Sequence, residues 1–241
     1  MKEIYNNILQ AISASQKQLA VLIDPDKFQL ENTKRFIDKV NKSVATHIFV
    51  GGSEVEINQT EILVKELKKL TKLPIVLFPG DVTQITNEAD AILFLSLISG
   101  RNSDYLIGKH VESVSKLNNT NLEVIPTGYL LIENGKETAV QRVTETEPLS
   151  RNNVQIITDT AKAGELSGMK LMYLEAGSGA THPVPPEIIS KVKTNIQIPL
   201  IVGGGIRTKQ QLDVTYNSGA DLVVIGTAFE DDEDFFEGLK F

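Results

Sequence analysis

The chain has 241 residues, 41% of them hydrophobic, a formal net charge of −7 and no cysteine. This length suits one domain with a substantial core. The absence of cysteine excludes disulfides, thiolate metal sites and cysteine nucleophiles, and the negative charge argues against a nucleic-acid partner, which requires a basic surface.

The N-terminal residues lack the apolar core of a signal peptide, and the longest apolar stretch, around residues 91–98, is too short to span a bilayer. We therefore expect a cytoplasmic protein.

Eight short apolar runs of the kind that form buried strands occur along the chain. In chain order they are residues 19–23, 47–50, 74–78, 91–95, 123–127, 171–174, 200–202 and 222–225. Amphipathic stretches lie between them, such as 59–70, where Ile62, Leu63, Leu67 and Leu70 recur at helical spacing, and Thr208 is placed to cap a further helix. Alternation of strand and helix from end to end predicts a parallel sheet, and eight units favour a closed (β/α)8 TIM barrel over an open doubly wound sheet. No linker or composition break interrupts residues 1–241, so we expect a single domain.

The connection between the fifth and sixth strands is longer than the others. It includes Leu130-Leu-Ile132 and then Glu133-Asn-Gly-Lys136, whose Asn-Gly pair can make a tight turn. Residues 129–147 are therefore expected to form either a hairpin over the barrel mouth or a surface excursion used in subunit contact.

Polar residues follow nearly every apolar run, at the end of the barrel where catalytic groups stand. The loops after strands 6, 7 and 8 are rich in glycine, as in Gly203-Gly-Gly205 and Gly226-Thr227, and they predict phosphate-binding loops built from backbone N–H groups. The loops after the first three strands instead carry hard oxygen ligands suited to Mg²⁺, namely Asp24, Asp26, Ser53, Glu54 and Asp81. The mouth is thus predicted to take two anionic substrates, a phosphate and a metal-bound diphosphate.

Several of these motifs together resemble the geranylgeranylglyceryl phosphate synthase family, which includes the bacterial heptaprenylglyceryl phosphate synthases. The motifs are Ile23-Asp-Pro-Asp-Lys27, Gly51-Gly-Ser53, Tyr173-Leu-Glu-Ala-Gly-Ser-Gly179, Gly203-Gly-Gly-Ile206 and Ile225-Gly-Thr227. The resemblance covers nearly the whole chain. It implies a β/α barrel that joins sn-glycerol 1-phosphate to a prenyl diphosphate, geranylgeranyl diphosphate above all, through an ether bond in phospholipid biosynthesis.

The same resemblance implies where the ligands bind. Mg²⁺ would be held through Asp24 and Ser53. Glycerol phosphate would contact Tyr173, Leu174, Glu175, Ala176, Gly177, Ser178, Gly179, Gly204, Gly205, Gly226 and Thr227. It also implies a homo-oligomer, either a dimer or a hexamer, and a lipid product implies transient contact with a membrane surface. Two positions depart from the family pattern: Leu22 stands where bacterial members often have Lys, and Thr227 where many members have Asn.

The predicted catalytic residues are Glu175, which would orient the glycerol hydroxyl and accept its proton, and its neighbour Tyr173. Apolar residues beside the fourth strand end, Leu95, Leu97 and Ile98, are expected to form the wall of a groove for the prenyl tail. The alternative function is a sugar-phosphate isomerase or lyase on a similar barrel, which would share the phosphate loops but need no apolar groove. A non-catalytic phosphate-binding protein is a third interpretation.

Some polar residues have simpler interpretations. Asp24, Asp26 and Ser53 can each cap a helix, and Arg101 suits a surface salt bridge as well as a diphosphate contact. The acidic cluster 231–234 is predicted to be a solvated helix start. The three histidines, His47, His110 and His182, have no metal-ligand spacing and are assigned no role.

Overall fold

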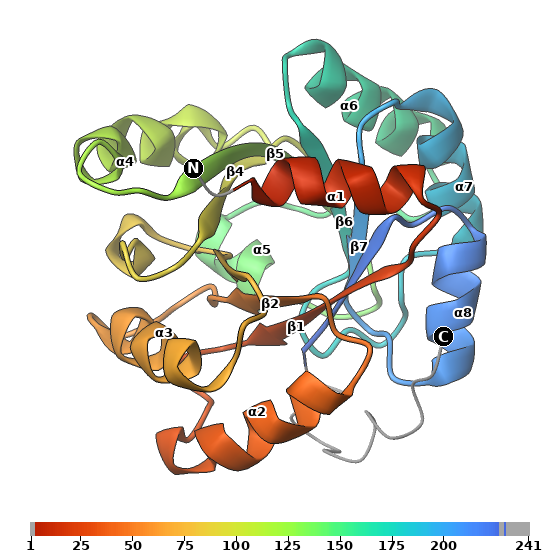
Figure 1. The fold of residues 1–241 in the computed structure, drawn as a ribbon. Helices are drawn as coiled ribbons and strands as arrows, with labels where there is room; N and C mark the ends of the chain where they lie inside the picture. The colour runs from red at the N-terminus through yellow and green to blue at the C-terminus, as the bar shows by residue number, and fades with distance from the viewer. Residues whose placement is uncertain (1–2, 227–228, 230–241) are drawn as a thin grey trace.

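The computed structural model describes residues 3–226 and residue 229, and it is a closed barrel of eight parallel strands in the order β1 to β8 (Figure 1). The strands are β1 (Gln18–Ile23), β2 (His47–Val50), β3 (Ile75–Leu77), β4 (Ala91–Leu97), β5 (Glu123–Leu131), β6 (Leu171–Glu175), β7 (Leu200–Gly203) and β8 (Leu222–Ile225). The barrel closes where β8 pairs with β1, with Val224 opposite Ala20. This closure confirms the predicted (β/α)8 barrel and excludes the open sheet.

Amphipathic helices cover the outside of the barrel. They are α2 (Thr33–Lys42), preceded by the 3₁₀ turn η1 (Leu30–Asn32), α3 (Gln59–Leu70), α4 (Lys109–Leu117), α6 (Val154–Leu166), α7 (Pro186–Asn195) and α8 (Lys209–Asn217). Most of them bury an apolar face: α2, for example, buries Phe36, Ile37 and Val40, whereas the buried residue of α4 is Ser113. The Thr208 side chain accepts a hydrogen bond from the Gln211 N–H, which confirms the predicted cap of α8. Among the described residues, none of the helices is both long and apolar enough to cross a membrane.

A helix at the start of the chain closes the barrel at the N-terminal ends of its strands. This helix, α1 (Ile4–Ser13), crosses the barrel in Figure 1. Its buried residues Ile4 and Ile8 belong to the cluster that fills the barrel interior, together with Phe49 and Tyr173. The two cores, inside the barrel and between barrel and helices, leave the opposite end of the barrel for ligands.

The connection from β3 to β4 contains no α-helix, so the predicted alternation of strand and helix is wrong at this point. Residues 78–90 form only the 3₁₀ turn η2 (Val82–Gln84), which Asp81 caps by accepting from the Thr83 N–H. The chain turns at Gly80, where an added Cβ would lie 2.5 Å from the Gly52 carbonyl oxygen. This close packing folds the segment back over the end of β2 instead of starting a helix, and it leaves an opening between η2 and α4.

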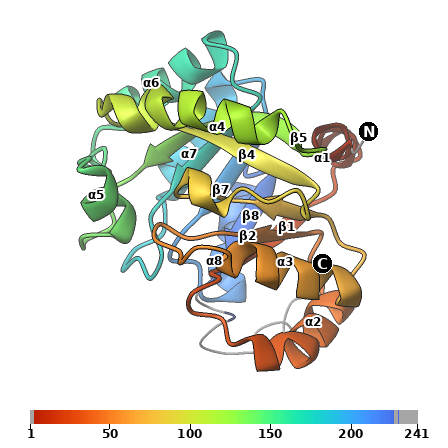
Figure 2. The same cartoon turned by 90° about the vertical axis from the view of Figure 1, so that its left-hand side faces the viewer.

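The connection from β5 to β6 places a short helix over the barrel mouth. β5 extends to Leu131, and α5 (Ala139–Thr144) follows after a loop, so the predicted hairpin is wrong. The Asn134 side chain bonds to the Ala176 carbonyl oxygen at 2.5 Å, because this residue is buried against the β6 loop instead of reversing the chain. Figure 2 shows α5 and α1 at opposite ends of the barrel. Use of this segment in subunit contact stays a prediction.

Candidate active site

A cavity at the C-terminal ends of the strands brings both predicted subsites together, and it is larger than the apolar cavity that adjoins it. Its lining includes Asp24 and Ser53 from the loops after β1 and β2. From the other side it is lined by Tyr173, Glu175, Gly177, Ser178, Gly179, Gly204, Gly205 and Gly226. The predicted metal side and the predicted phosphate side therefore share one cavity.

Three residues of the predicted glycerol phosphate site are placed differently. The side chains of Leu174 and Ala176 are fully buried in the core between barrel and helices, because alternate residues of a strand face opposite sides. Neither residue lines the cavity. Thr227 lies outside the described residues, as does the acidic cluster 231–234.

Glu175 is buried at the end of β6 and is the most perturbed carboxyl group of the cavity. One of its oxygens accepts a hydrogen bond from the Gly177 N–H at 2.5 Å. Burial raises the pKa of Glu175 from 4.5 to about 6, and the nearby Tyr173 hydroxyl and the hydrogen bond from Gly177 partly offset this rise. A carboxylate with a pKa near neutrality is well matched to accepting a proton.

Tyr173 is buried at the base of the same cavity. Among the described residues, none makes a hydrogen bond of ordinary geometry to its hydroxyl. Burial raises the pKa of Tyr173 well above its ordinary value, and the nearby Glu175 carboxylate raises it further. A buried hydroxyl without a partner is costly in a folded protein. This hydroxyl is therefore suited to a ligand that supplies the partner.

Two aromatic residues that the sequence analysis did not single out pack around Tyr173. The Phe78 ring stacks on Tyr173 at 5.4 Å between centroids, and the Tyr129 ring meets Tyr173 edge-on at 5.3 Å. Tyr129 lies directly opposite Tyr173 in the β5–β6 register, so strand register was the signal that could have located it. Phe78 follows β3 immediately and gave no comparable signal.

The glycines after β7 allow the loop to pass close to Tyr173 and Glu175. A Cβ on Gly203 would lie 2.4 Å from the Tyr173 hydroxyl oxygen, and one on Gly204 would lie 2.4 Å from Glu175 Oε1. Gly204 also has a φ of +86°, in the left-handed region that favours glycine. Any side chain at these positions would fill the space beside the predicted catalytic pair.

The opposite side of the cavity carries oxygen ligands in a setting that fits Mg²⁺. The Asp24 carboxylate lies against the glycine next to Ser53, since a Cβ on Gly52 would be 2.9 Å from Asp24 Oδ1. Asp24 also pairs with Lys27 at 2.8 Å. Within the described residues, no group of three or more His, Cys, Asp or Glu side chains is arranged to hold a metal. One carboxylate and one hydroxyl suit Mg²⁺, which keeps waters and binds substrate phosphates.

The other acidic residues predicted on this side serve other contacts. Both oxygens of Asp26 accept a hydrogen bond from the Glu56 N–H at 3.1 Å, a structural role. Glu54 pairs with Arg142 of α5 at 3.2 Å, and Asp81 pairs with Lys109 of α4 at 2.7 Å. The Arg101 side chain donates to the carbonyl oxygen of its neighbour Gly100.

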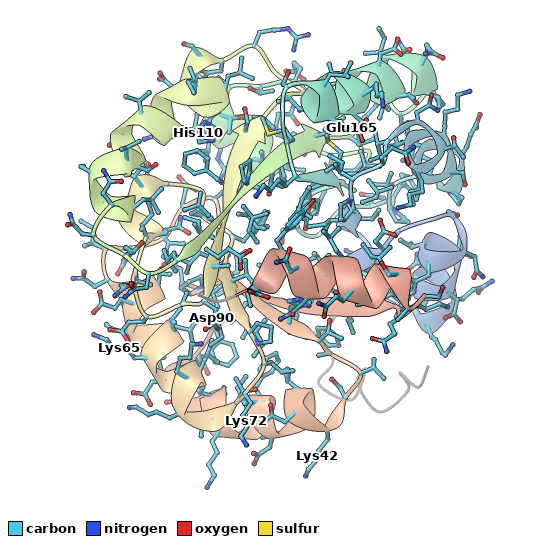
Figure 3. The ribbon with its side chains drawn as sticks, turned by 45° about the horizontal axis from the view of Figure 1, so that its top comes forward. Lys42, Lys65, Lys72, Asp90, His110 and Glu165 are labelled. Carbon is cyan, nitrogen blue, oxygen red and sulfur yellow. The ribbon has the colours of Figure 1, made fainter. Side chains whose placement is uncertain are left out.

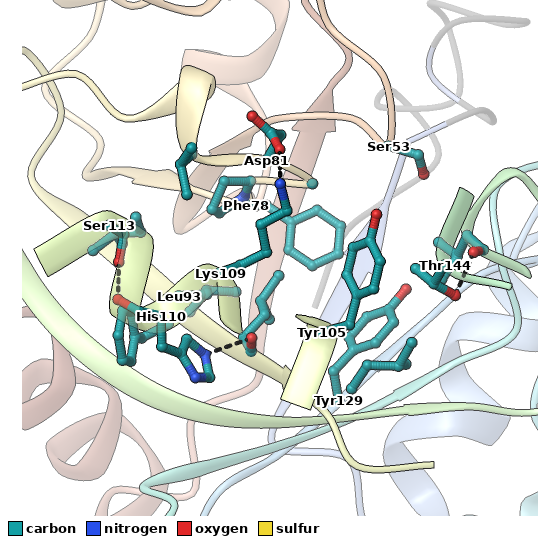
Figure 4. A pocket seen from close by; sticks show the side chains of 18 of the residues that line it. Ser53, Phe78, Asp81, Leu93, Tyr105, Lys109, His110, Ser113, Tyr129 and Thr144 are labelled. Carbon is teal, nitrogen blue, oxygen red and sulfur yellow. Dashed lines mark hydrogen bonds and ion pairs between the residues drawn. The ribbon is translucent and has the colours of Figure 1, made fainter. Parts of the chain in front are cut away.

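A second, mainly apolar cavity adjoins the first at Gly52, Ser53, Phe78, Tyr129 and Val140 (Figure 4). It occupies the opening between η2 and α4, where the barrel has no helix of its own after β3. Its lining includes Leu93, Leu95, Leu97, Tyr105 from the π-helical segment η3 (Asp104–Gly108), and Val143 of α5. The Lys109–Asp81 pair also lines this cavity.

The predicted groove wall is correct for Leu95 and Leu97, which line this cavity, and wrong for Ile98. The Ile98 side chain faces the outer core, where its Cδ1 lies 2.7 Å from the position of a Cβ on Gly164 of α6. His110 also lines the cavity, although it was assigned no role; its ring stacks on Phe94 at 4.1 Å and bonds to the Leu95 carbonyl oxygen at 2.7 Å.

Comparison with known proteins identifies the family. Residues 12–239 match the PcrB family. The chain belongs to the PcrB family. It is 58% identical over 234 residues to the geranylgeranylglyceryl phosphate synthase of Flavobacterium johnsoniae, covering 97% of this chain and 96% of that protein. It is 38% identical to the synthase of Pyrococcus abyssi, covering 99% and 93% of the two chains.

A solved structure at 30% identity agrees with the whole barrel. The crystal structure of (S)-3-O-geranylgeranylglyceryl phosphate synthase from Thermoplasma acidophilum in complex with substrate sn-glycerol-1-phosphate superposes with a TM-score of 0.91 at 30% identity. The match covers 98% of this chain and 95% of that chain. A thiamine phosphate pyrophosphorylase from Pyrococcus furiosus, at 16% identity and a TM-score of 0.56, shares the barrel fold alone.

Proposed function

We propose that this chain is a prenyltransferase that joins sn-glycerol 1-phosphate to a prenyl diphosphate through an ether bond, with geranylgeranyl diphosphate as the expected donor. The observation that carries the proposal is the junction of two cavities of different chemistry. One cavity is lined by glycine-rich loops and Glu175, and the other is lined mainly by apolar side chains. A sugar-phosphate isomerase or lyase would leave the apolar cavity without a use. The activity named for the relatives at 58% and 38% identity supports the same choice.

The residues at the junction suit an alcohol attacking an allylic carbon. The phosphate of glycerol phosphate would lie against the backbone of Gly177–Gly179 and Gly204–Gly205, with the reacting hydroxyl near Glu175 and Tyr173. As the carbon–oxygen bond to diphosphate breaks, its electron pair leaves with the diphosphate. The glycerol oxygen bonds to the carbon, and its proton passes to the Glu175 carboxylate. Such a general base typically contributes about 10²–10⁴-fold to the rate.

The aromatic rings beneath the junction support the same step. Positive charge develops on the allylic carbon as diphosphate departs, and the faces of Phe78, Tyr129 and Tyr173 can stabilise it. The apolar cavity would hold the prenyl tail, and each buried CH₂ contributes roughly 0.8 kcal/mol to binding. It would also keep water from the reactive carbon.

We further propose that Asp24 and Ser53 hold Mg²⁺ at the diphosphate side of the junction. When bound, the ion would offset the negative charge that develops on the leaving diphosphate. A homo-oligomer, either dimer or hexamer, a cytoplasmic location and transient contact with a membrane surface stay predictions of the family resemblance.

An extraction assay tests the proposed function. The protein is incubated with radiolabelled sn-glycerol 1-phosphate, Mg²⁺ and prenyl diphosphates of several chain lengths. We expect label to move into the organic phase with at least one donor, and chelation of the metal to abolish the transfer. Failure with every donor would refute the function, and full activity after chelation would refute the role of Mg²⁺ alone.

A further inference from the structure

The basic side chains around the two adjoining cavities fall into two groups. Three are already matched with carboxylates of the loops after β1, β2 and β3: Lys27 with Asp24, Arg142 with Glu54 and Lys109 with Asp81, at 2.7 to 3.2 Å. Two others, Arg207 and Lys136, lie by the glycine-rich loop after β6. Neither makes an ion pair with any residue that the structure describes. The unmatched positive charge therefore gathers on the phosphate side.

Arg207 follows the glycines of β7 and lines the larger cavity. Its Nη1 donates to the Ala180 carbonyl oxygen at 3.0 Å, and its backbone N–H donates to the Gln211 side chain at 2.8 Å. These contacts fix the residue beside the loop 177–180. A guanidinium group has five N–H donors, so one bond to a carbonyl leaves donors for a ligand.

Lys136 approaches the same loop from the connection between β5 and α5. Its Nζ lies 3.1 Å from the position that a Cβ on Gly179 would occupy. The ammonium group thus stands next to Gly179, whose φ is +66°. Arg207 and Lys136 reach the loop from two different elements.

A phosphate monoester carries about 1.5 to 2 negative charges at neutral pH. The same cavity holds the Glu175 carboxylate, whose charge would repel that ligand. Backbone N–H groups supply partial charges only, so full cations beside the loop would offset the repulsion. We propose that Arg207 binds the phosphate group of the glycerol phosphate, with Lys136 as a weaker second contact. This inference rests on the proposed function, since it names residues that recognise one of its two substrates.

The proposal also explains how the cavity tells its two anionic substrates apart. Cations already paired with carboxylates attract a further anion less than unpaired cations do. The glycerol phosphate would be recognised by Arg207, which can bond to two phosphate oxygens at once, whereas the diphosphate would be recognised together with its metal. Loss of Arg207 should therefore weaken one substrate and spare the other.

Calorimetric titration of sn-glycerol 1-phosphate into metal-free protein, without a prenyl donor, tests this assignment. We expect Arg207→Met to weaken binding at least tenfold, Arg207→Lys to retain part of the affinity, and Lys136→Met to weaken binding about threefold. The matched control is Arg151→Met, because Arg151 donates to the Pro183 carbonyl oxygen of the same connection at 3.4 Å but does not line the cavity. The control should bind normally.

Steady-state kinetics with both substrates adds a second readout. Arg207→Met should raise the KM for glycerol phosphate and leave the KM for the prenyl diphosphate unchanged. If Arg207→Met does not fold, Arg207→Gln, which keeps a donor for the Ala180 carbonyl but loses the charge, takes its place.

The possible results distinguish failure of the Arg207 assignment from failure of the proposed function, on which the assignment rests. If the unaltered protein does not bind glycerol phosphate, the proposed function fails. If it binds and Arg207→Met binds within twofold of it, the assignment of Arg207 is overturned while the function stands. An equal loss in Arg151→Met would also overturn it, because the effect would then come from holding the loop.

Discussion

The buried carboxyl groups at the N-terminal end of the barrel and the buried Glu175 at its C-terminal end have different partners. At the N-terminal end, Asp221 lies just before β8, pairs with Lys193 of α7 at 2.6 Å and accepts the Leu200 N–H at the start of β7 at 2.7 Å. Asp90 repeats this arrangement four strands earlier: it lies just before β4, pairs with Lys68 of α3 and accepts the N–H at the start of β3.

Two further carboxylates extend the pattern at the same end. Glu165, near the end of α6, pairs with Lys162 and accepts two N–H groups before β7 (Figure 3). Glu123 accepts the N–H groups of Ile4 and Tyr5, and so fixes α1 across the barrel.

At the C-terminal end, Glu175 receives one backbone N–H and the Tyr173 hydroxyl lacks a partner among the described residues. The buried carboxylates at the N-terminal end are thus satisfied by the chain itself, whereas Glu175 and Tyr173 at the C-terminal end leave polar atoms for a ligand. Residues that stabilise the fold and residues suited to chemistry therefore lie at opposite ends of the barrel, as is general for β/α barrels.

Among the variants at the two ends of the barrel, Glu175→Gln has the largest expected effect. Turnover should fall by about 10²–10⁴-fold, because the amide cannot accept the proton. Binding of glycerol phosphate should persist or strengthen, since the amide removes a negative charge. In the unaltered protein, turnover should fall as the pH drops through about 6, where Glu175 becomes protonated.

The same substitution should stabilise the fold at high pH. The folded pKa of Glu175, about 6, exceeds its ordinary value of 4.5, so the unfolded chain ionises first and stability falls as the pH rises through this window. The difference corresponds to roughly 2 kcal/mol. Chemical denaturation of both proteins should therefore show Glu175→Gln to be more stable at pH 8 and nearly equal at pH 4. Normal turnover, or a lower stability at pH 8, would contradict the role given to this carboxylate.

Two glycines have nearly the same backbone conformation but different surroundings, one at the cavity and one away from it. Gly204 has φ +86° and Gly168, between α6 and β6, has φ +94°, so a side chain strains the backbone at both. A Cβ at Gly204 would meet Glu175, whereas one at Gly168 would have no atom within 4 Å. We expect Gly204→Ala to weaken binding of glycerol phosphate more than tenfold, a loss of about 1.4 kcal/mol or more.

Gly168→Ala is the matched control for this change. It should lower the free energy of unfolding by about 1 kcal/mol and leave binding unchanged, because its effect is backbone strain alone. Calorimetry and denaturant unfolding of both variants measure the two effects. Equal binding losses would mean that Gly204 matters only for its conformation.

The sequence predicts the part of the molecule in which residue pattern and geometry are directly linked. Each strand is a short apolar run, and the C-terminal strand ends of a parallel barrel meet at one mouth. The sequence therefore predicts that Asp24, Ser53 and Glu175 lie together, and the structure places them in one cavity. The predicted phosphate-loop glycines Gly204, Gly205 and Gly226 line the same cavity.

The features that the sequence does not predict depend on tertiary contacts. The segment after β3 forms no helix because Gly80 packs against the β2 loop, and that contact has no local signature. The Asn-Gly pair at residues 134–135 suggests a turn, but burial of Asn134 against Ala176 overrides it. The apolar cavity results from both departures, since it occupies the opening after β3 and is covered by α5.

The smallest expected effect comes from a pair of tyrosines, one at each end of the barrel. Tyr216 donates its hydroxyl proton to the Gln18 carbonyl oxygen at 2.7 Å, whereas the Tyr173 hydroxyl has no such partner among the described residues. Tyr216→Phe should therefore lower the free energy of unfolding by about 1 kcal/mol and leave turnover intact. Tyr173→Phe should leave the free energy of unfolding unchanged or slightly raised. It should reduce kcat about tenfold, because one hydrogen bond to the ligand is lost. Denaturant unfolding and steady-state kinetics of both variants measure this exchange of effects. If Tyr173→Phe loses stability and keeps its turnover, the Tyr173 hydroxyl has a partner within the chain, as Tyr216 does, and it does not serve a ligand.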